Sequence, residues 1–595
     1  MIVTLRTEIL QMINHKMKKL SFILALFFMT FGVSAQVDSP LTLEAIESGI
    51  ITFTNKAWFP VSYCIDGGAT QTIDAEQQKE IVVSSGQKVT FFGDNPEYSD
   101  GNYNSSNIRG SSPFYAYGNV MSLVNSKEYA TAKTLVQGWV FARLFEGAAT
   151  LTSHPTKELV LPATTITDGC YQYMFNGCKS LTRAPKLPAS NVAHSCYEGM
   201  FSGCEKLVTA PELPATKMAE DCYYNMFFGC SALTTAPKLP ATTLANRCYE
   251  HMFHGCQSLT TAPELPATKM ALACYYAMFA DCFSLAVAPK LPATTLDTGC
   301  YEYMFQRCSI AEAPALPATT LANECYASMF LSCTKLASAP LLPATTMAEH
   351  CYSGMFASCT ALTEAPMLPA TTLAESCYNG MFSGCTMLTQ APELPATKMV
   401  KYCYANMFNN CTALTEMPEL PSTSLAEECY SGMFGYCTGL TKVHQLPATT
   451  LVQGCYRYMF EYCTGLQASP VLPAPKLVDF SYEQMFYGCS SLSKVTCLIT
   501  DFNDAWWGLY YWLTSVSPTG TFVMAKGMQP QWPVGGEFGF PAGWTIEETD
   551  AETDIQSIDD HRAVSAPYYD LSGRYVTSPS KGLYIYDGKK VLLRK

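Results

Sequence analysis

A repeat with a period of 26 residues constrains the fold of this 595-residue chain more than any other feature. The block CYxxMFxxC recurs along the middle of the chain, and a second block, LTxAPxLPATTL, separates successive copies. A unit this short cannot bury its own apolar face, so the copies must stack and share one continuous core. One step is 25 residues long, and a thirteenth copy has Ser481 in the first cysteine position. The first cysteines of the other copies are Cys170, Cys196, Cys222, Cys248, Cys274, Cys300, Cys325, Cys351, Cys377, Cys403, Cys429 and Cys455.

Each repeat is predicted to contain one short helix and one short strand. On a helical wheel that starts at Cys170, the side chains of Met174, Cys178 and Leu181 fall on one arc, together with Ile166. We therefore expect CYxxMFxxC to form a helix with one buried face, followed by LTxAP as a strand that its proline ends. Strands stack about 4.8 Å apart and helices about 8–10 Å apart, so the stack should bend with its strands on the concave side. The predicted fold class is an α/β solenoid of about thirteen 26-residue coils.

The repeats resemble the leucine-rich repeats of the BspA-like surface proteins of Bacteroidetes. The resemblance rests on MFxxCxxL, as in Met226 to Leu233, where that family has AFxxCxxL, and it covers roughly residues 161–497. The repeat has 26 residues rather than about 23, and an Ala-Pro pair replaces branched strand residues, which leaves the strand length open. The resemblance implies a leucine-rich-repeat-like horseshoe that acts in adhesion at the cell surface, and it implies no particular ligand.

The first residues have the features of a secretory signal peptide. Lys18 and Lys19 form a positive region, residues 20–33 are almost all apolar, and Val33-Ser34-Ala35 offers a cleavage site. We assign residues 17–35 to this signal and residues 1–16 to an upstream extension with a misassigned start. The signal predicts a protein that is secreted or associated with the outer membrane or cell surface. No later segment has about 18 consecutive apolar residues, so we expect no transmembrane segment in the mature chain.

Two further segments precede the repeat array. Residues 36–118 are predicted to form a small β-domain, because apolar and polar residues alternate in Ile51–Thr54 and in Val89–Phe92. Asp66-Gly67-Gly68 is a hairpin signal in this domain. Residues 119–160 contain a degenerate repeat and are predicted to cap the array, which we assign to residues 161–500.

The segments after the array are a predicted cap and a predicted tail. Residues 501–548 form the cap, in which we expect Trp506, Trp507 and Trp512 to pack inward, with sugar stacking as the alternative. Residues 549–595 are predicted to form a linker and a small β-hairpin module. That module resembles the C-terminal sorting domains of the type IX secretion route, through YDLSGRxV, KGLYI and GKKV. It lacks the upstream Pro-Asn-Pro element of that family, so a terminal domain without a sorting role is the alternative.

The 27 cysteines are predicted to be mostly buried thiols that act as small apolar residues. Paired cysteines lie eight residues apart, which is about 12 Å along a helix and exceeds the reach of a disulfide. The spacing also differs from the CxxC pattern of zinc sites, and we predict no metal and no cofactor. Oxidation stays open as an alternative, because exported chains can form disulfides. The repeated Tyr and Met-Phe residues are expected to belong to the core.

Charge and motifs narrow the classes of function. The net charge of −13 argues against a nucleic-acid partner, which would need clustered cations. The sequence has no HExxH, GxSxG or GxxxxGK[ST] motif, and no carboxylate pair recurs from coil to coil. We expect a non-enzymatic, monomeric scaffold that binds a host protein, a matrix protein or a glycan. The alternatives are an extracellular enzyme of the glycan hydrolase type, with its site in a flanking domain, and a purely structural surface protein.

One position of the repeat supplies the candidate binding residues. It lies between Ala-Pro and Leu-Pro, and its residues first alternate in charge and then become apolar. A ladder of alternating surface charge contributes little stability, whereas an exposed apolar patch rimmed by charges is typical of partner sites. We therefore expect the contact region along this position. Its residues are Lys186, Glu212, Lys238, Glu264 and Lys290, followed by Ala315, Leu341 and Met367.

Overall fold

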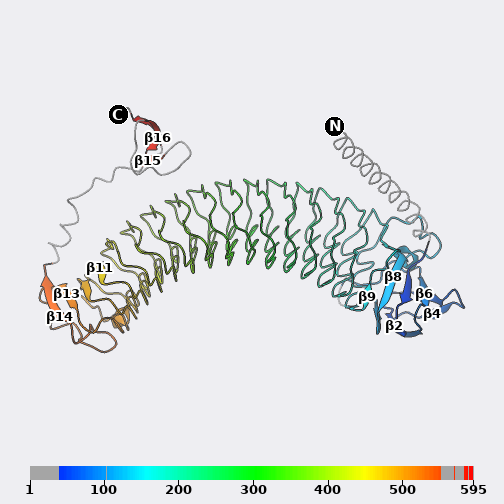
Figure 1. The fold of residues 1–595 in the computed structure, drawn as a ribbon, viewed down its shortest axis with the longest axis horizontal. Coiled ribbons are helices and arrows are strands. Elements are labelled where there is room, and N and C mark those ends of the chain that lie inside the picture. The colour runs from blue at the N-terminus through cyan, green and yellow to red at the C-terminus, as the bar shows by residue number, and fades with distance from the viewer. Residues whose placement is uncertain (1–38, 102–103, 551–567, 570–581, 587–588, 594–595) are drawn as a thin grey trace, which may run out of the picture.

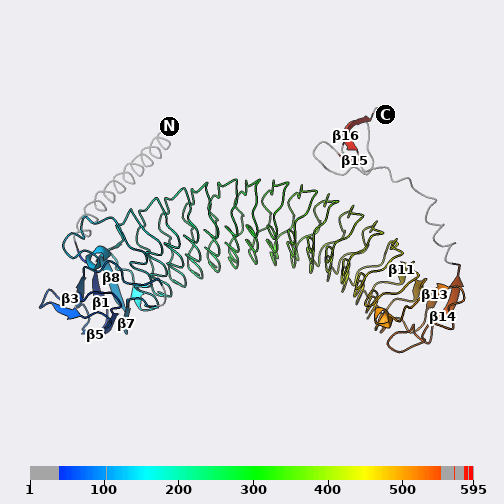
Figure 2. The ribbon, with the colours of Figure 1, turned by 180° about the vertical axis from the view of Figure 1, so that it is seen from behind.

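The computed structural model describes residues 39–101, 104–550, 568–569, 582–586 and 589–593. Figures 1 and 2 show a curved stack of coils, with a β-domain at its N-terminal end and a further sheet at its C-terminal end. The predicted signal peptide and upstream extension lie outside the described residues, as does most of the predicted tail. No helix among the described residues has the length and hydropathy that a membrane span requires.

The N-terminal domain consists of two packed β-sheets. One sheet has the strand order β10-β8-β1-β6-β3-β4, with β9 also paired to β8, and the other has the order β5-β2-β7. Phe53 and Phe91 face each other between the sheets, with ring centroids 5.3 Å apart. The alternating segments of the sequence lie in β2 and β6, and the turn at Asp66 joins β3 to β4. The strands are β1 (Thr42–Ala45), β2 (Gly49–Thr54), β3 (Val61–Ile65), β4 (Gln71–Ile73), β5 (Gln78–Val83), β6 (Lys88–Phe92), β7 (Asn107–Gly110), β8 (Phe114–Asn119), β9 (Leu151–Thr152) and β10 (Leu159–Val160).

The N-terminal domain is continuous with the array. β9 and β10 belong to the segment that enters the first coils, and both pair parallel to β8. Between β8 and that segment lies a 3₁₀-helix, η1 (Val120–Leu123), whose first turn is capped by the side chain of Asn119. The domain and the array therefore share backbone hydrogen bonds rather than meeting through a linker.

The short helix predicted for each repeat is wrong, because CYxxMFxxC forms a series of turns. The backbone is left-handed at every fourth residue, with φ of 59° at Gly169, 53° at Tyr173 and 73° at Gly177. An α-helix cannot contain such residues. No α-helix occurs anywhere in the described part of the chain, so the fold class is a solenoid of stacked coils and not an α/β one.

Hydrogen bonds between coils explain this conformation. Within a coil, Met174 N–H donates to the carbonyl of Tyr171 at 3.1 Å, as in a turn. The next residue, Phe175, instead donates to the carbonyl of Met200 in the following coil at 2.9 Å. Alternate N–H groups thus bond within one coil and to the next, which satisfies the buried backbone without a helix. Neighbouring coils are consequently spaced like strands: stacked tyrosine rings such as Tyr171 and Tyr197 lie 5.8 Å apart, not the 8–10 Å of packed helices.

The predicted strand of each repeat is reduced to single bridges in most coils. One line of bridges includes Thr209 to Thr235 and Thr235 to Thr261, and a second includes Lys217 to Thr243. The Ala-Pro pair accounts for this reduction, because proline has no N–H to continue the ladder.

Longer parallel strands form only at the C-terminal end of the array. There β11 (Ala468–Leu472), β12 (Lys494–Cys497), β13 (Thr521–Ala525) and β14 (Thr545–Thr549) form one sheet in chain order. A 3₁₀-helix, η2 (Trp506–Leu509), lies between β12 and β13. Beyond this sheet, the described parts of the tail are β15 (Tyr568–Tyr569), β16 (Gly582–Tyr586) and β17 (Lys589–Leu593), which pair antiparallel.

Ladders of identical side chains form the core of the array. The repeated Cys, Tyr, Met and Phe residues are almost fully buried, which confirms their predicted place in the core. All 27 cysteines lie within the described residues and are free thiols. The second cysteine of each repeat donates to a carbonyl of the preceding coil, as Cys230 Sγ does to Phe201 at 3.1 Å. Burial raises the pKa of the Cys230 thiol to about 12, so the thiol stays protonated and keeps this bond.

Candidate functional site

The candidate binding residues of the sequence all lie on the surface, in one column that we call the variable column. It comprises one residue per coil, between a proline and a leucine that are mostly buried. Because the extended chain alternates inward and outward here, the middle residue points to solvent in every coil. The column contains Lys186, Glu212, Lys238, Glu264, Lys290, Ala315, Leu341 and Met367, and all are exposed.

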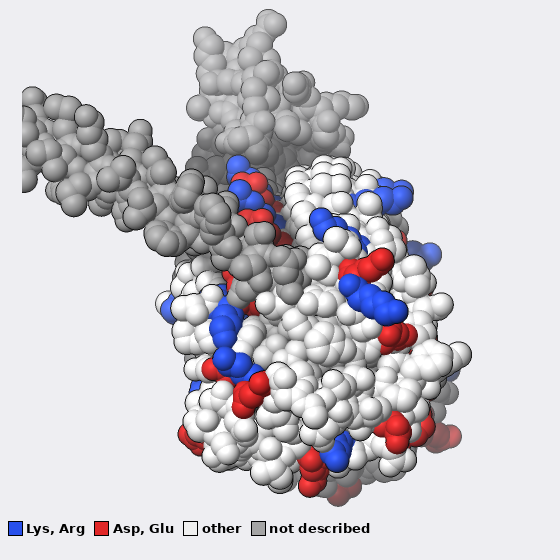
Figure 3. Space-filling model, turned by 90° about the vertical axis from the view of Figure 1, so that its right-hand side faces the viewer, with Lys and Arg blue, Asp and Glu red and all other residues white. Residues whose placement is uncertain are grey.

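The charged part of the column is not an ion-pair ladder. Lys186 Nζ lies 3.3 Å from Glu158 Oε2, and no ion pair joins two members of the column within the described residues. Lys238 and Glu264 instead line a shallow groove of about 420 Å³ between neighbouring coils, together with Pro237 and Pro263. Their charges are therefore free to meet a partner. At the N-terminal end of the molecule, Figure 3 shows basic and acidic side chains interspersed rather than gathered by sign.

The apolar part of the column is strongly exposed. Leu341 is 70% exposed and Met367, in the next coil, is 42% exposed. Val287 is 69% exposed and lies three residues before Lys290, on the adjoining line of bridges, so it adds an exposed apolar side chain beside the column. The sequence prediction missed Val287 because it considered only one position of the repeat.

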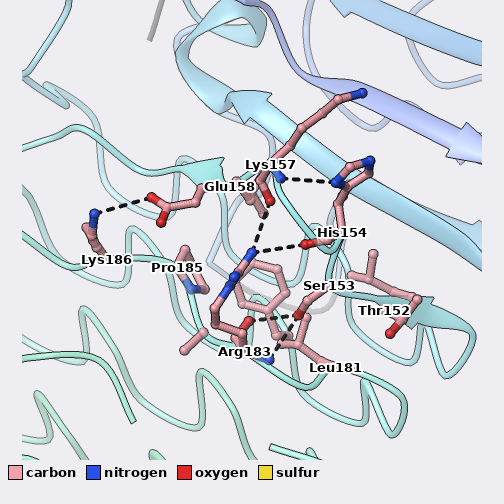
Figure 4. A pocket seen from close by; sticks show the side chains of 14 residues that line it. Thr152, Ser153, His154, Lys157, Glu158, Leu181, Arg183, Pro185 and Lys186 are labelled. Atoms are coloured by element: carbon pink, nitrogen blue, oxygen red, sulfur yellow. Dashed lines mark hydrogen bonds and ion pairs between the residues drawn. The ribbon is translucent and has the colours of Figure 1, made fainter. Parts of the chain in front are cut away.

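A small pocket of about 120 Å³ lies at the start of the column, where the N-terminal domain meets the array (Figure 4). Arg183 donates to the carbonyls of His154 and Lys157, at 3.0 and 3.1 Å. His154 Nδ1 accepts the backbone N–H of Lys157 at 3.0 Å, and burial lowers the pKa of His154. The polar groups around this pocket are thus paired with one another, and they join the domain to the first coils.

A second hollow lies on another edge of the coils, and we call it the phenylalanine groove. It is defined by Phe228, His254, Asp281, Phe283 and Arg307, and it has a volume of about 470 Å³. Phe228 is 38% exposed and Phe283 is 46% exposed. The ring of His254 stacks on Phe228 with centroids 4.8 Å apart. His254 Nε2 lies 3.2 Å from Asp281 Oδ2, which also accepts a bond of 2.8 Å from Arg307.

Half-buried titratable groups lie in the coils that form this groove. Burial raises the pKa of Glu250 to about 7, against a lowering effect of Arg247. Burial also raises the pKa of Glu302 to about 7, with the charge of Glu324 adding to the shift. His251 Nδ1 lies 3.2 Å from His254 Nδ1, and burial lowers the pKa of His251 to about 4. The pKa values of these three side chains thus differ from their ordinary values, and no sequence motif indicates this.

The sequence contains a partial signal for the phenylalanine groove. Phe228 occupies a repeat position held by Ser202 and Ser383 in other coils. Phe283 occupies a position held by threonine in six later coils, such as Thr334. Comparing the copies position by position would have identified Phe283 as a departure from the repeat, whereas the position of Phe228 varies too widely to single it out. Their neighbourhood across coils follows only from the stacking.

Catalytic and metal centres are not evident in the described residues. No group of three His, Cys, Asp or Glu side chains there is arranged to hold a metal ion. In the predicted C-terminal cap, Trp512 is fully buried, whereas Trp507 is 54% exposed and contacts Tyr510 edge-on at 5.1 Å. The inward packing expected for the three tryptophans is therefore correct for Trp512 and wrong for Trp507.

Comparison with known families identifies the repeats. The family described as the BspA type leucine rich repeat region matches in six copies, over residues 152–286, 275–389 and 401–504. These matches cover more than half of the chain. A search of curated proteins found no match.

Proposed function

Because this chain belongs to the BspA-type leucine-rich repeat family, we propose that it is an exported binding scaffold of the cell surface or the secreted medium. Its ligand in this proposal is a host protein, a matrix protein or a glycan. Export rests on the signal features of residues 17–35, and the sorting-like tail would help to retain the protein at the surface. Families of this type generally provide non-enzymatic scaffolds, and the protein accordingly binds without performing a reaction.

The observation that carries the proposal is the contrast between a constant core and a variable column. The ladder residues repeat almost unchanged from coil to coil and are buried. The column residue is charged from Lys186 to Lys290 and apolar from Ala315 to Met367, and it is exposed in each of these coils. Core packing does not constrain the residue type at an exposed position, so this residue can vary to suit a binding partner. Leu341 and Met367 supply the apolar centre, because exposed apolar residues beside charges are typical of partner sites.

A binding screen tests this proposal. The purified full-length protein is passed over immobilised matrix proteins and glycans, and a saturable signal is expected with at least one of them. The double variant Leu341→Lys/Met367→Lys should weaken that signal, because it places two charges in the apolar centre. The matched control is Val82→Lys, which changes an equally exposed apolar residue on β5, far from the column.

The outcomes test separately whether the protein binds a ligand and whether it does so through the variable column. Binding that survives the double variant keeps the scaffold and removes the column from its site. Absence of binding to every immobilised ligand contradicts the proposal and favours a purely structural surface protein.

A further inference from the structure

Two partly exposed phenylalanines lie on one edge of the array, outside the variable column. Phe228 occupies a position that varies widely and holds Ser202, Leu331 or Tyr487 in other coils, whereas Phe283 occupies a position that is threonine in six later coils. Both phenylalanines keep more than a third of their surface exposed. Phe228 packs on His254 with ring centroids 4.8 Å apart, and the part of each phenylalanine ring that stays in solvent is apolar surface that a ligand can cover. They lie two coils apart and line the same phenylalanine groove.

Glycine keeps the floor of this groove open. Gly229 and Gly255 occupy the same repeat position, with φ of 69° and 74°, and the same position holds Asp281 and Arg307 in the next two coils. A Cβ atom on Gly255 would meet only the backbone of Gly229, at 3.5 Å. At this repeat position the coil of Phe228 and the coil after it therefore carry no side chain, whereas the next two coils carry Asp281 and Arg307, which we call the charged wall.

The charged wall offers both hydrogen-bond donors and acceptors in a fixed arrangement. Asp281 accepts from Arg307 and lies beside His254, which itself stacks on Phe228. The side chain of Arg307 is 52% exposed, so its guanidinium has donors left for a ligand. The paired charges of Asp281 and Arg307 compensate each other. This compensation disfavours strongly charged ligands of either sign and suits a neutral ligand with many hydroxyl groups.

We propose that the phenylalanine groove binds a pyranose unit of a neutral glycan. The apolar C–H face of a pyranose packs on an aromatic ring such as Phe228 or Phe283, and its hydroxyl groups bond to Arg307 and Asp281. The volume of about 470 Å³ lies within the range of small-molecule sites. This inference rests on the proposed binding function and gives it a ligand class and a site distinct from the variable column.

The test uses the full-length protein and four neutral hexasaccharides, built from glucose, mannose, galactose and N-acetylglucosamine. Calorimetric titration is expected to detect binding of at least one, with Kd of about 1 mM or tighter. Phe228→Ser and Phe283→Thr each install the residue that other coils have at that position, so folding should be retained. Each is expected to weaken binding about tenfold, through loss of the stacking surface.

Two further variants test the geometry of the groove. Gly255→Asn should also weaken binding, because its side chain fills the floor of the groove. The variant should fold, since Asn410 occupies the same repeat position with φ of 59°. Leu331→Ser is the control, since it changes the same repeat position as Phe228 in a later coil. It should leave binding unchanged.

Three results would overturn the inference. The first is that none of the hexasaccharides binds at about 10 mM. The second is that binding occurs but the groove variants leave it unchanged, which would move the saccharide elsewhere. The third is that the same variants abolish binding of an immobilised matrix protein while no saccharide binds, which would assign the groove to a polypeptide. The first and third results leave the scaffold function standing, because they concern the groove and not the column.

Discussion

The ring of Tyr171 lies on the ring of Tyr197, 26 residues later, with centroids 5.8 Å apart and planes inclined by 3°. The same relationship recurs along the tyrosine column, and a parallel one joins the phenylalanines, as in Phe175 and Phe201 at 5.5 Å. A shift of one coil by a single residue would break both columns at once. The aromatic ladders therefore hold the coils in register, in the way that cross-strand pairs hold a sheet.

We predict that a phenylalanine of this ladder is essential for stability. Phe356 is fully buried and stacks on Phe330 at 5.7 Å, so Phe356→Ala should lower the free energy of unfolding by about 3–5 kcal/mol. Denaturant unfolding followed by circular dichroism measures this loss. The control is Leu341→Ala, whose side chain is 70% exposed and whose effect should stay within about 0.5 kcal/mol. Equal effects of the two variants would contradict the ladder as a source of stability.

Glycine substitutions at residues with a left-handed backbone distinguish the turns of the array from a helix. Ala273 has φ of 48°, a conformation that costs alanine energy and that glycine adopts freely. Ala273→Gly should therefore stabilise the protein by about 0.5–1 kcal/mol. Ala245 lies in a neighbouring coil and has no positive φ, so Ala245→Gly should destabilise it by a similar amount. Thermal unfolding measures both changes. Destabilisation by both variants would contradict the turns and favour a helix at CYxxMFxxC.

Thiol chemistry should distinguish the array from the N-terminal domain. Burial raises the pKa of array cysteines, to about 12 for Cys170 and Cys230, and removes them from solvent. Iodoacetamide at pH 8 should label the native protein at Cys64 at most, which is only partly buried. After unfolding in guanidinium, all 27 cysteines should react, as mass spectrometry can count. Unreacted cysteines in the unfolded chain would reveal disulfides.

Stability should depend on pH through Glu250 and Glu302. Both have a pKa raised to about 7 in the folded state, so the stabilisation by their protonated forms is full at acidic pH and is lost as the pH rises through 7. Between pH 6.5 and 8, each should contribute a loss of about 0.5 kcal/mol after allowance for solvent screening. The double variant Glu250→Gln/Glu302→Gln should remove this dependence.

The pH window of that measurement matters because His251 acts in the opposite sense. Its pKa is lowered from 6.5 to about 4, so its contribution to stability is lost as the pH falls through this range. As the pH rises above 6.5, His251 becomes neutral in the unfolded state as well, so its effect on stability fades while that of the two carboxyl groups continues. Parallel unfolding curves for wild type and the double variant in the upper window would contradict the assignment.

Much of the architecture follows from the sequence by simple physical reasoning. The period of 26 residues demands stacked coils, and the identical apolar residues of successive copies demand ladders in a shared core. The exposure of Leu341 and Met367 also follows, since Pro and Leu on either side have to point inward. The helix prediction failed because nine residues cannot separate a period of 3.6 from the period of four that the turns adopt. Residues such as Tyr173 give no sign of a left-handed backbone in their side chains.

The repeat, its buried ladders and its variable column can be predicted from the amino-acid sequence, because they depend on patterns that are local to one coil. The tertiary structure alone decided the turn conformation and the phenylalanine groove. The turns arise because Phe175 finds its acceptor in the next coil rather than in its own. The groove arises because Phe228 and Phe283, 55 residues apart in the chain, line the same hollow once the coils are stacked. Both depend on hydrogen bonds and contacts between coils, which no pattern within a single repeat encodes.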